Sequence, residues 1–170
     1  MARKNHHCLL TDIAYGLAAG AAATFVMDKV STFAYQLEDE STRRHEENLR
    51  RQEYPPEVLA GKIAKALCGV ELDKETKQKR ASAIHWGYGI FWGGVFGALR
   101  DRAPLVGSAC GLAFGFGLWL IGDEVMMPVL GLTPPSLEFP WPNHARAAAN
   151  HLAYGGTLGV THGLLRKIGG

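Results

Sequence analysis

Two matched sets of ionisable side chains occur in a chain whose long segments are otherwise apolar. Each set has one aspartate, one histidine and one tyrosine: Asp28, His85 and Tyr88 in the first, and Asp123, His151 and Tyr154 in the second. A histidine beside a carboxylate can change charge near neutral pH and pass on a proton. Two histidines and two aspartates could instead bind a metal ion, and the two histidines alone could bind haem iron. The same groups can also form only hydrogen bonds that hold helices together.

The two sets occupy equivalent positions in an internal repeat. The motif Gly-Leu-Ala-x-Gly begins at Gly16 and again at Gly111, and in both copies an aspartate follows 12 residues after the first glycine. The longer pattern His-x-x-Tyr-Gly-x-x-x-Gly-x-x-x-Gly-x-Leu-Arg begins at His85 and at His151, with seven identities at matched spacing. Each copy is therefore expected to be one structural unit, here a pair of helices.

The elements that position these residues are four apolar spans, each close to the roughly 20 residues that cross a bilayer. The predicted spans are 12–36, 82–99, 104–125 and 145–165. The sequence thus predicts an all-α integral membrane four-helix bundle, with residues 1–170 as one membrane domain. The alternative is a soluble helical bundle, but soluble helices carry a polar outer face and the stretch 89–97 has none.

The direction of the helices predicts where the two sets lie. Two helices per copy return the chain to its starting side, so the copies are expected to be parallel repeats related by a twofold axis along the membrane normal. The aspartates lie towards the ends of the first and third spans, and the histidines near the starts of the second and fourth. At about 1.5 Å per residue these groups fall at similar depth, with the tyrosines one turn deeper. All six side chains are expected to form one polar cluster.

Glycines spaced four apart recur in every span and predict close helix crossings, because small residues let backbones approach within a membrane. The predicted packing glycines are Gly16, Gly20, Gly89, Gly93, Gly97, Gly107, Gly111, Gly115, Gly155, Gly159 and Gly163.

The charged residues gather in the linker 38–80, which holds ten acidic and ten basic side chains. We expect this linker to lie outside the membrane. Its first part, 38–53, reads as a charged exposed helix, and 57–70 reads as a short amphipathic helix that lies on the membrane surface or packs against the bundle.

The distribution of basic residues gives an orientation and a location. Short basic ends at residues 3–4, 100–102 and 166–167 favour both termini in the cytoplasm, although the basic residues of the linker oppose this. The expected partner is the lipid bilayer, with a homodimer or a larger membrane complex as a further expectation. Basic residues form no nucleic-acid-like patch, so no nucleic-acid partner is predicted.

Several motifs resemble a known family. The segment Gly131-Leu132-Thr133-Pro134-Pro135 is followed by Phe139-Pro140-Trp141 and then by a helix with His-x-x-Tyr. Together with Gly122-Asp123-Glu124-x-x-Met127-Pro128, it resembles the YagU-like bacterial inner-membrane proteins, a family with a domain of unknown function. The resemblance covers most of the chain and is weakest in the linker. It implies a small multi-pass inner-membrane protein with a link to acid tolerance, and it supplies no catalytic residue.

These observations favour a non-enzymatic role. The leading hypothesis is a structural or accessory membrane bundle whose polar cluster holds helices together. The alternative is proton or ion passage through the cluster, and the third is a haem-binding or metal-binding subunit. We predict no catalytic residue, no metal ligand and no cofactor.

Overall fold

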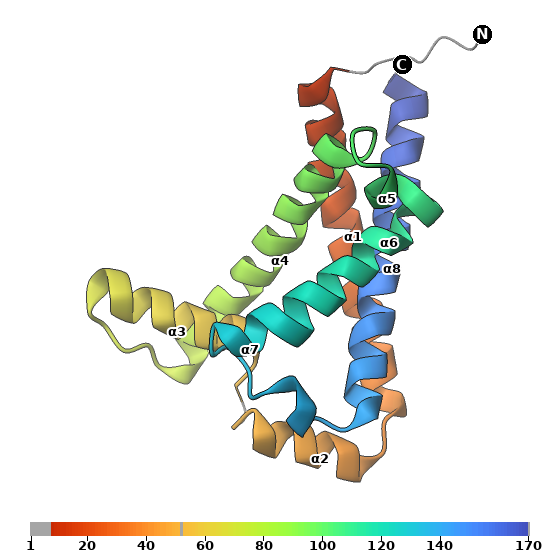
Figure 1. Cartoon of the computed structure of the whole chain (residues 1–170). Helices are drawn as coiled ribbons and strands as arrows, with labels where there is room; N and C mark the ends of the chain where they lie inside the picture. The colour runs from red at the N-terminus through yellow and green to blue at the C-terminus, as the bar shows by residue number, and fades with distance from the viewer. Residues whose placement is uncertain (1–7, 52, 170) are drawn as a thin grey trace, which may run out of the picture.

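The computed structural model describes residues 8–51 and 53–169, and within them every regular element is a helix. Four long segments run along the molecule: α1 (Leu9–Leu37), α4 (Lys74–Leu99), the segment Pro104–Val129 and α8 (Trp141–Gly169). The first and third run one way and the other two run back, so α1 begins at the end of the molecule where α8 ends (Figure 1). The predicted all-helical class is confirmed.

Two of the four predicted spans are long and apolar enough to cross a membrane. They are Leu9–Leu37 and Pro104–Val129. Among the described residues α4 and α8 do not reach this criterion, and both carry charged residues within their helical length. The four-span membrane bundle therefore stays a prediction.

The helix ends differ from the predicted bounds because of local capping. The second span was expected to begin at residue 82, but α4 begins at Lys74 inside the charged linker. The Asp73 carboxylate accepts a hydrogen bond from the Thr76 backbone N–H at 2.9 Å, which caps the helix there. The predicted bounds of the first and fourth spans fall short of the helices by one to four residues at each end.

Glycines pack α1 against α4. A β-carbon built on Gly93 would overlap the backbone of Gly16 and Gly20, and one on Gly97 would overlap the backbone of α1 at Asp12. Gly89 lies against the Thr24 side chain in the same way. Five of the predicted packing glycines thus form this one crossing, and no larger residue fits without separating the helices.

The second crossing uses the equivalent motif but in a different register. Gly111 and Gly115 enclose Gly155, whereas Gly16 and Gly20 enclose Gly93. The repeat aligns Gly155 with Gly89, so the second pair of helices meets four residues, or one turn, earlier. The two pairs are consequently similar in sequence and inequivalent in structure.

The third span is not the continuous helix that was predicted for 104–125. It consists of α5 (Pro104–Gly107), the short η1 (Ser108–Gly111), α6 (Leu112–Gly117), the π-helix η2 (Leu118–Met126) and α7 (Met127–Val129). Ala109, Cys110 and Gly111 all have positive φ, which breaks the helix within η1, ahead of α6. The π-helix carries both Asp123 and Glu124.

Two predicted packing glycines do not lie at a helix crossing. Gly107 lies in the broken part of the third segment, where a β-carbon would meet Arg100 of the preceding turn. Gly163 faces the end of the Arg100 side chain. For these positions the spacing alone was misleading.

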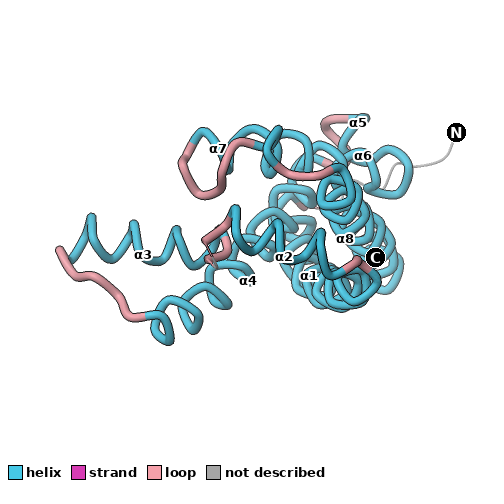
Figure 2. Tube along the Cα trace, turned by 90° about the horizontal axis from the view of Figure 1, so that it is seen from below, coloured by secondary structure: helices cyan, strands magenta, loops and turns pink. Residues whose placement is uncertain are grey.

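The linker folds into α2 (Glu40–Leu49) and α3 (Pro55–Cys68), and α8 is preceded by the short η3 (Ser136–Glu138). Figure 2, seen from below, shows α3 projecting to one side, away from α1 and α8. Both linker helices lie at the end of the molecule remote from the start of α1 (Figure 1).

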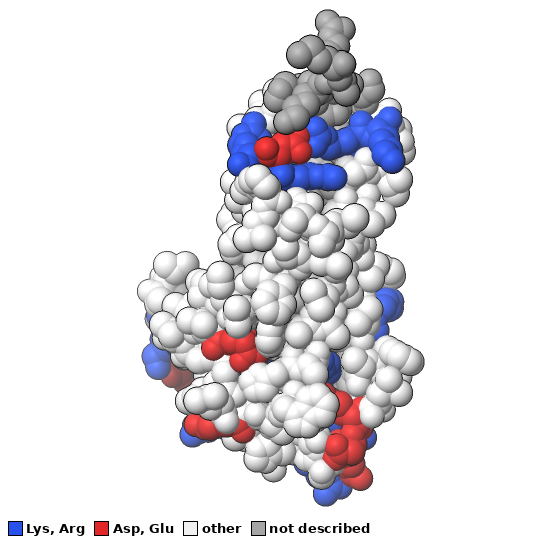
Figure 3. All heavy atoms as spheres, turned by 45° about the vertical axis from the view of Figure 1, so that its right-hand side comes forward, with Lys and Arg blue, Asp and Glu red and all other residues white. Residues whose placement is uncertain are grey.

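Charged side chains lie at the two ends of the molecule and leave its middle uncharged. Figure 3 shows a band of lysine and arginine at one end, a wide uncharged zone and a mixture of acidic and basic groups at the other end. Large apolar side chains are exposed along the third segment, at Leu105, Leu112, Phe116, Leu120, Ile121, Val125 and Val129.

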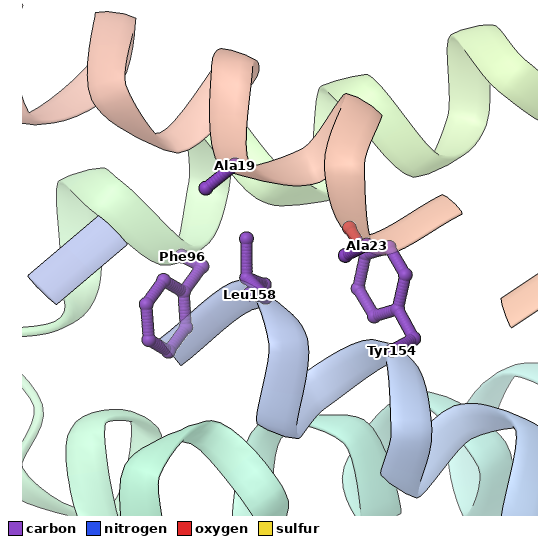
Figure 4. Packing of buried hydrophobic residues seen from close by; sticks show 5 residues of the cluster. All are labelled: Ala19, Ala23, Phe96, Tyr154 and Leu158. Atoms are coloured by element: carbon purple, nitrogen blue, oxygen red, sulfur yellow. The ribbon is translucent and has the colours of Figure 1, made fainter. Parts of the chain in front are cut away.

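A small buried core closes the centre of the bundle. Ala19 and Ala23 of α1, Phe96 of α4, and Tyr154 and Leu158 of α8 meet there (Figure 4). Ala19, Phe96 and Leu158 are each 0% exposed. This layer separates the two charged ends of the molecule.

Candidate functional site

A cavity of about 360 Å³ lies at the linker end of the bundle. Its walls come from α1, α4, η2 and α8, from the linker and from the segment 130–139. Five of the six residues of the predicted polar cluster line it: His85, Tyr88, Asp123, His151 and Tyr154. Asp28 is not part of the lining but is bonded to His85. The structure thus brings all six residues to one region.

The first aspartate–histidine pair is closed. His85 Nε2 lies 2.8 Å from Asp28 Oδ1, within hydrogen-bond distance. Both side chains are more than a third exposed. The contact joins α1 to α4 beside the glycine crossing, which is the helix-pinning arrangement expected for a structural cluster.

The second pair is open. His151 Nδ1 lies 3.6 Å from Asp123 Oδ2, which is too long for a hydrogen bond. The same nitrogen is 3.0 Å from the carbonyl oxygen of Ala147 and donates to it. The earlier crossing and the π-helix together place Asp123 differently from Asp28 relative to its histidine.

The two tyrosines also differ. The Tyr154 hydroxyl is buried and donates to the Gly89 carbonyl oxygen at 2.6 Å, which joins the two halves of the chain. Tyr88 is 41% exposed and packs edge-on against Trp92, with ring centroids 5.9 Å apart. Neither hydroxyl makes a hydrogen bond to an aspartate among the described residues.

A further carboxylate–histidine contact in the pocket, between Glu124 and His144, was missed by the sequence reasoning. Glu124 Oε1 lies 2.7 Å from His144 Nδ1, and His144 Nε2 lies 3.3 Å from the Phe139 carbonyl oxygen. Both ring nitrogens face acceptors, an arrangement that the doubly protonated imidazolium satisfies. No repeat equivalent signals this pair, because Lys29 stands at the position that matches Glu124.

A buried charge network ties the linker to α8 and was also missed. Glu46, only 2% exposed, accepts from Arg50 at 2.9 Å, from Arg146 at 2.5 Å and from the Asn143 amide at 2.9 Å. Arg146 also bonds Glu38, and burial raises the pKa of the Glu38 carboxyl against the lowering effect of that guanidinium. The first linker helix is therefore docked through Glu46, its one buried residue, while most of its other side chains are exposed as expected.

A separate polar group lies at the opposite end of the bundle. His162 is 0% exposed; its Nδ1 accepts from Arg100 at 2.8 Å, and its Nε2 donates to the Asp12 carbonyl oxygen at 3.1 Å. Arg166 pairs with Asp101 at 2.8 Å and lies 3.4 Å from Asp12. His162 is thus a packed polar contact.

The contacts of the two histidines bear on the metal and haem hypotheses. Within residues 8–51 and 53–169, no three His, Cys, Asp or Glu side chains form a group that could hold a metal ion. The Nε2 atom of His85 is engaged by Asp28, and the Nδ1 atom of His151 by Ala147. Each ring therefore offers only one remaining nitrogen.

Comparison with known proteins gives a family and no function. The model of a family described as "protein of unknown function (DUF1440)" matches residues 43–160, which is more than half of the chain. No curated protein and no solved structure matches. The family model does not carry the name of the YagU-like proteins, so the specific resemblance to them stays a prediction.

Proposed function

The chain belongs to the DUF1440 family, whose function is unknown, and we propose that it is a small multi-pass protein of the bacterial inner membrane. Two segments are apolar enough to cross a bilayer, and the uncharged zone between the charged ends supports four crossings (Figure 3). The exposed apolar side chains of the third segment suit contact with lipid or with another membrane subunit.

We place both termini in the cytoplasm. The basic band lies at the end where α1 begins and α8 ends (Figures 1 and 3), and cytoplasmic ends are rich in lysine and arginine. The basic residues of the linker oppose this orientation, because the rule counts basic residues whether or not they are paired with acids, as in Lys77–Glu53 at 2.6 Å. The linker helices and the pocket would then face the periplasm.

The natural cysteines allow a direct test of this orientation. Cys8 and Cys68 are both exposed; Cys8 directly precedes α1 and Cys68 is the last residue of α3 in the linker, so the proposed topology puts them on opposite sides of the membrane. In single-cysteine variants, a membrane-impermeant maleimide added to spheroplasts should label Cys68, and it should label Cys8 only after permeabilisation. The reverse labelling pattern would invert the orientation, and equal labelling of both sites in sealed cells would contradict a spanning topology.

For the function itself we propose an accessory membrane bundle with a pocket that opens at one side, and no enzymatic role. The observation that carries this is the buried layer of Ala19, Phe96 and Leu158, which separates the pocket from the opposite charged end (Figure 4). Proton or ion passage would need a polar path through this layer. A one-sided pocket suits binding or sensing better than conduction.

A flux assay tests this choice against the alternative. The protein is reconstituted in liposomes with a pH-sensitive dye inside, and an acid step is applied outside. We expect the rate of internal acidification to equal that of protein-free liposomes. A faster rate that disappears in His85→Ala or His151→Ala, with folding retained, would establish proton passage in place of the accessory role.

A role in acid stress is a second candidate. Three histidines, His85, His144 and His151, line the same cavity, and histidine changes charge between pH 5 and 8. On the periplasmic side they would meet acid first. If the pocket serves this role, cells that carry His144→Gln in place of the wild-type protein should survive acid exposure less well. Equal survival of the deletion strain and the wild type would remove this candidate.

A further inference from the structure

The charges around the pocket are almost balanced. Arg50 is neutralised by Glu46 at 2.9 Å, and Glu46 shares a second guanidinium with Glu38 through Arg146. Glu124 is engaged by the His144 ring, with Oε1 2.7 Å from Nδ1. Each of these carboxylates therefore already has a close partner within the protein.

Asp123 is the carboxylate that remains. Its nearest basic partner, His151, stands 3.6 Å away and directs its Nδ1–H to Ala147. Its repeat equivalent, Asp28, has a histidine nitrogen at 2.8 Å. Asp123 thus brings to the cavity wall a carboxylate that makes no hydrogen bond to its histidine, and a carboxylate in such a position can pair with a bound cation.

The surrounding wall suits an organic cation. Tyr88, Trp92 and Tyr154 line the pocket together with Asp123, and aromatic faces attract ammonium groups through their quadrupoles. Three methionines, Met27, Met126 and Met127, line the same cavity and offer flexible, polarisable surface.

A buried polar atom supplies an independent indication of a ligand. Asn143 is 5% exposed and lines the pocket, and its Oδ1 finds no hydrogen-bond partner among the described residues. Buried polar groups are normally satisfied, so this acceptor oxygen is suited to an N–H donor of a bound molecule.

We propose that the pocket binds a small amphipathic organic amine in its cationic form, with Asp123 as the counter-ion and the aromatic residues as the wall. The volume of about 360 Å³ lies within the range of small-molecule sites, roughly 300–1,000 Å³. This inference deepens the proposed one-sided pocket and rests on it. It depends neither on the orientation in the membrane nor on the link to acid stress.

Calorimetric titration of the full chain in nanodiscs tests the proposal. The probes are N,N-dimethylbenzylamine in its protonated form, the neutral N-benzylacetamide and the anion benzenesulfonate, all of similar size. We expect saturable 1:1 binding of the cation, at least tenfold tighter than that of either other probe. Asp123→Asn should abolish this preference. Asp101→Asn, a partly exposed aspartate at the opposite end, should leave the affinity within about twofold.

The outcomes separate cleanly because the three probes are first compared on the wild-type protein, which does not depend on the folding of any variant. Equal binding of all three probes would mean an apolar pocket without charge selection and would overturn the proposal. Preference for the anion, the absence of saturable binding of the cation, or a preference that survives Asp123→Asn would also overturn it. None of these results would bear on the liposome flux assay, so the one-sided pocket would be judged separately.

Discussion

In the first helical pair His85 Nε2 lies 2.8 Å from Asp28, and in the second the histidine atom near the aspartate is Nδ1 of His151, 3.6 Å from Asp123. The local sequences are nearly the same, with the same spacing from glycine to aspartate. The difference arises from the crossing, which lies one turn earlier on α8 than on α4, and from the π-helix that carries Asp123.

The comparison teaches that a repeated motif sets the residues of a site but not their register. A helix crossing held by small residues can move by one turn and still place a glycine against a glycine. Each such move changes the partners of every side chain beyond the crossing. π-Helical turns are frequently found at functional sites, which agrees with the binding role proposed for Asp123 of the open pair.

The largest effects are expected at the centres of the two crossings. Gly93→Leu and Gly155→Leu should each prevent stable folding, because the added side chain would overlap the backbone of the facing helix. Overpacking usually costs about 1–3 kcal/mol and more where backbone must move. Gly87→Leu and Gly117→Leu are matched controls, since nothing lies within 4 Å of either β-carbon position. Yield and thermal unfolding in mild detergent measure the outcome, and equal stability of all four variants would contradict the two crossings.

The next effect concerns an arginine that the repeat places in both copies. Arg80 and Arg146 precede their histidines by five residues, yet only Arg146 joins the buried network with Glu38 and Glu46. Arg146→Gln should cost about 3–5 kcal/mol, because it leaves the largely buried Glu38 side chain without its partner and Glu46 with Arg50 as its one remaining cation. Arg80→Gln should change stability by no more than about 0.5 kcal/mol, as is usual for an exposed side chain.

Denaturant unfolding of both arginine variants provides the measurement. Similar losses in the two variants would show that the linker does not dock through Arg146. A loss confined to Arg146→Gln would show that the linker stabilises one copy of the repeat only.

A smaller effect should distinguish the two aspartates. Asp28→Asn removes a charge-assisted hydrogen bond in a partly exposed pair and should destabilise by about 1 kcal/mol or less. Asp123→Asn should be neutral or slightly stabilising, because it removes a charge that has no close partner. The two melting temperatures, measured side by side in detergent at neutral pH, give the answer. If Asp123→Asn were the more damaging change, the second pair would be closed in solution.

The smallest effect concerns the start of α4 compared with that of α8. Hydrogen bonds from the Thr76 backbone and hydroxyl lower the pKa of Asp73 below its ordinary value of 3.8. A lowered folded pKa means that the cap stabilises the helix above about pH 3.8 and that this contribution is lost as the pH falls. No aspartate stands directly before α8, which begins at Trp141.

Hydrogen exchange can detect this difference. Protection of the amides of residues 77–80 should fall between pH 7 and pH 3 in the wild type, whereas the start of α8 should change less. In Asp73→Ala, protection at residues 77–80 should already be reduced at pH 7 and should respond little to acid. An unchanged pH response in that variant would assign the effect to another group.

The parts of the fold that could be predicted are those written in local patterns. The apolar periodicity located α1 within three residues at each end, and the matched glycines identified both helical pairs. The start of α4 was placed eight residues late because the charged residues 74–80 masked a helix that Asp73 caps. The break at Ala109 and Cys110 gives no sequence signal, since neither residue type favours positive φ.

The pocket was predictable only as far as the repeat extends. The six residues of the polar cluster were chosen because their spacing recurs, and the structure places them together. The contacts of Glu46 with Arg146 and with Asn143 join positions about 100 residues apart, which no local pattern indicates. Even so, Arg146 recurs in the repeat as Arg80, so extending the alignment upstream of the histidines would have drawn attention to it.

The left-handed turn at 109–111 would limit where the bilayer lies in the proposed membrane topology. Ala109 and Cys110 are exposed, and hydrocarbon cannot satisfy irregular exposed backbone, so in that topology the lipid tails would begin beyond Gly111. The helical residues 112–129 would then cover at most about 27 Å, because 1.5 Å per residue holds for an α-helix and part of this segment is a π-helix. This length is close to the roughly 30 Å of a hydrocarbon core. The turn would thereby set the height of the proposed span in the membrane, and the longer α1 would tilt or project into the headgroup layers.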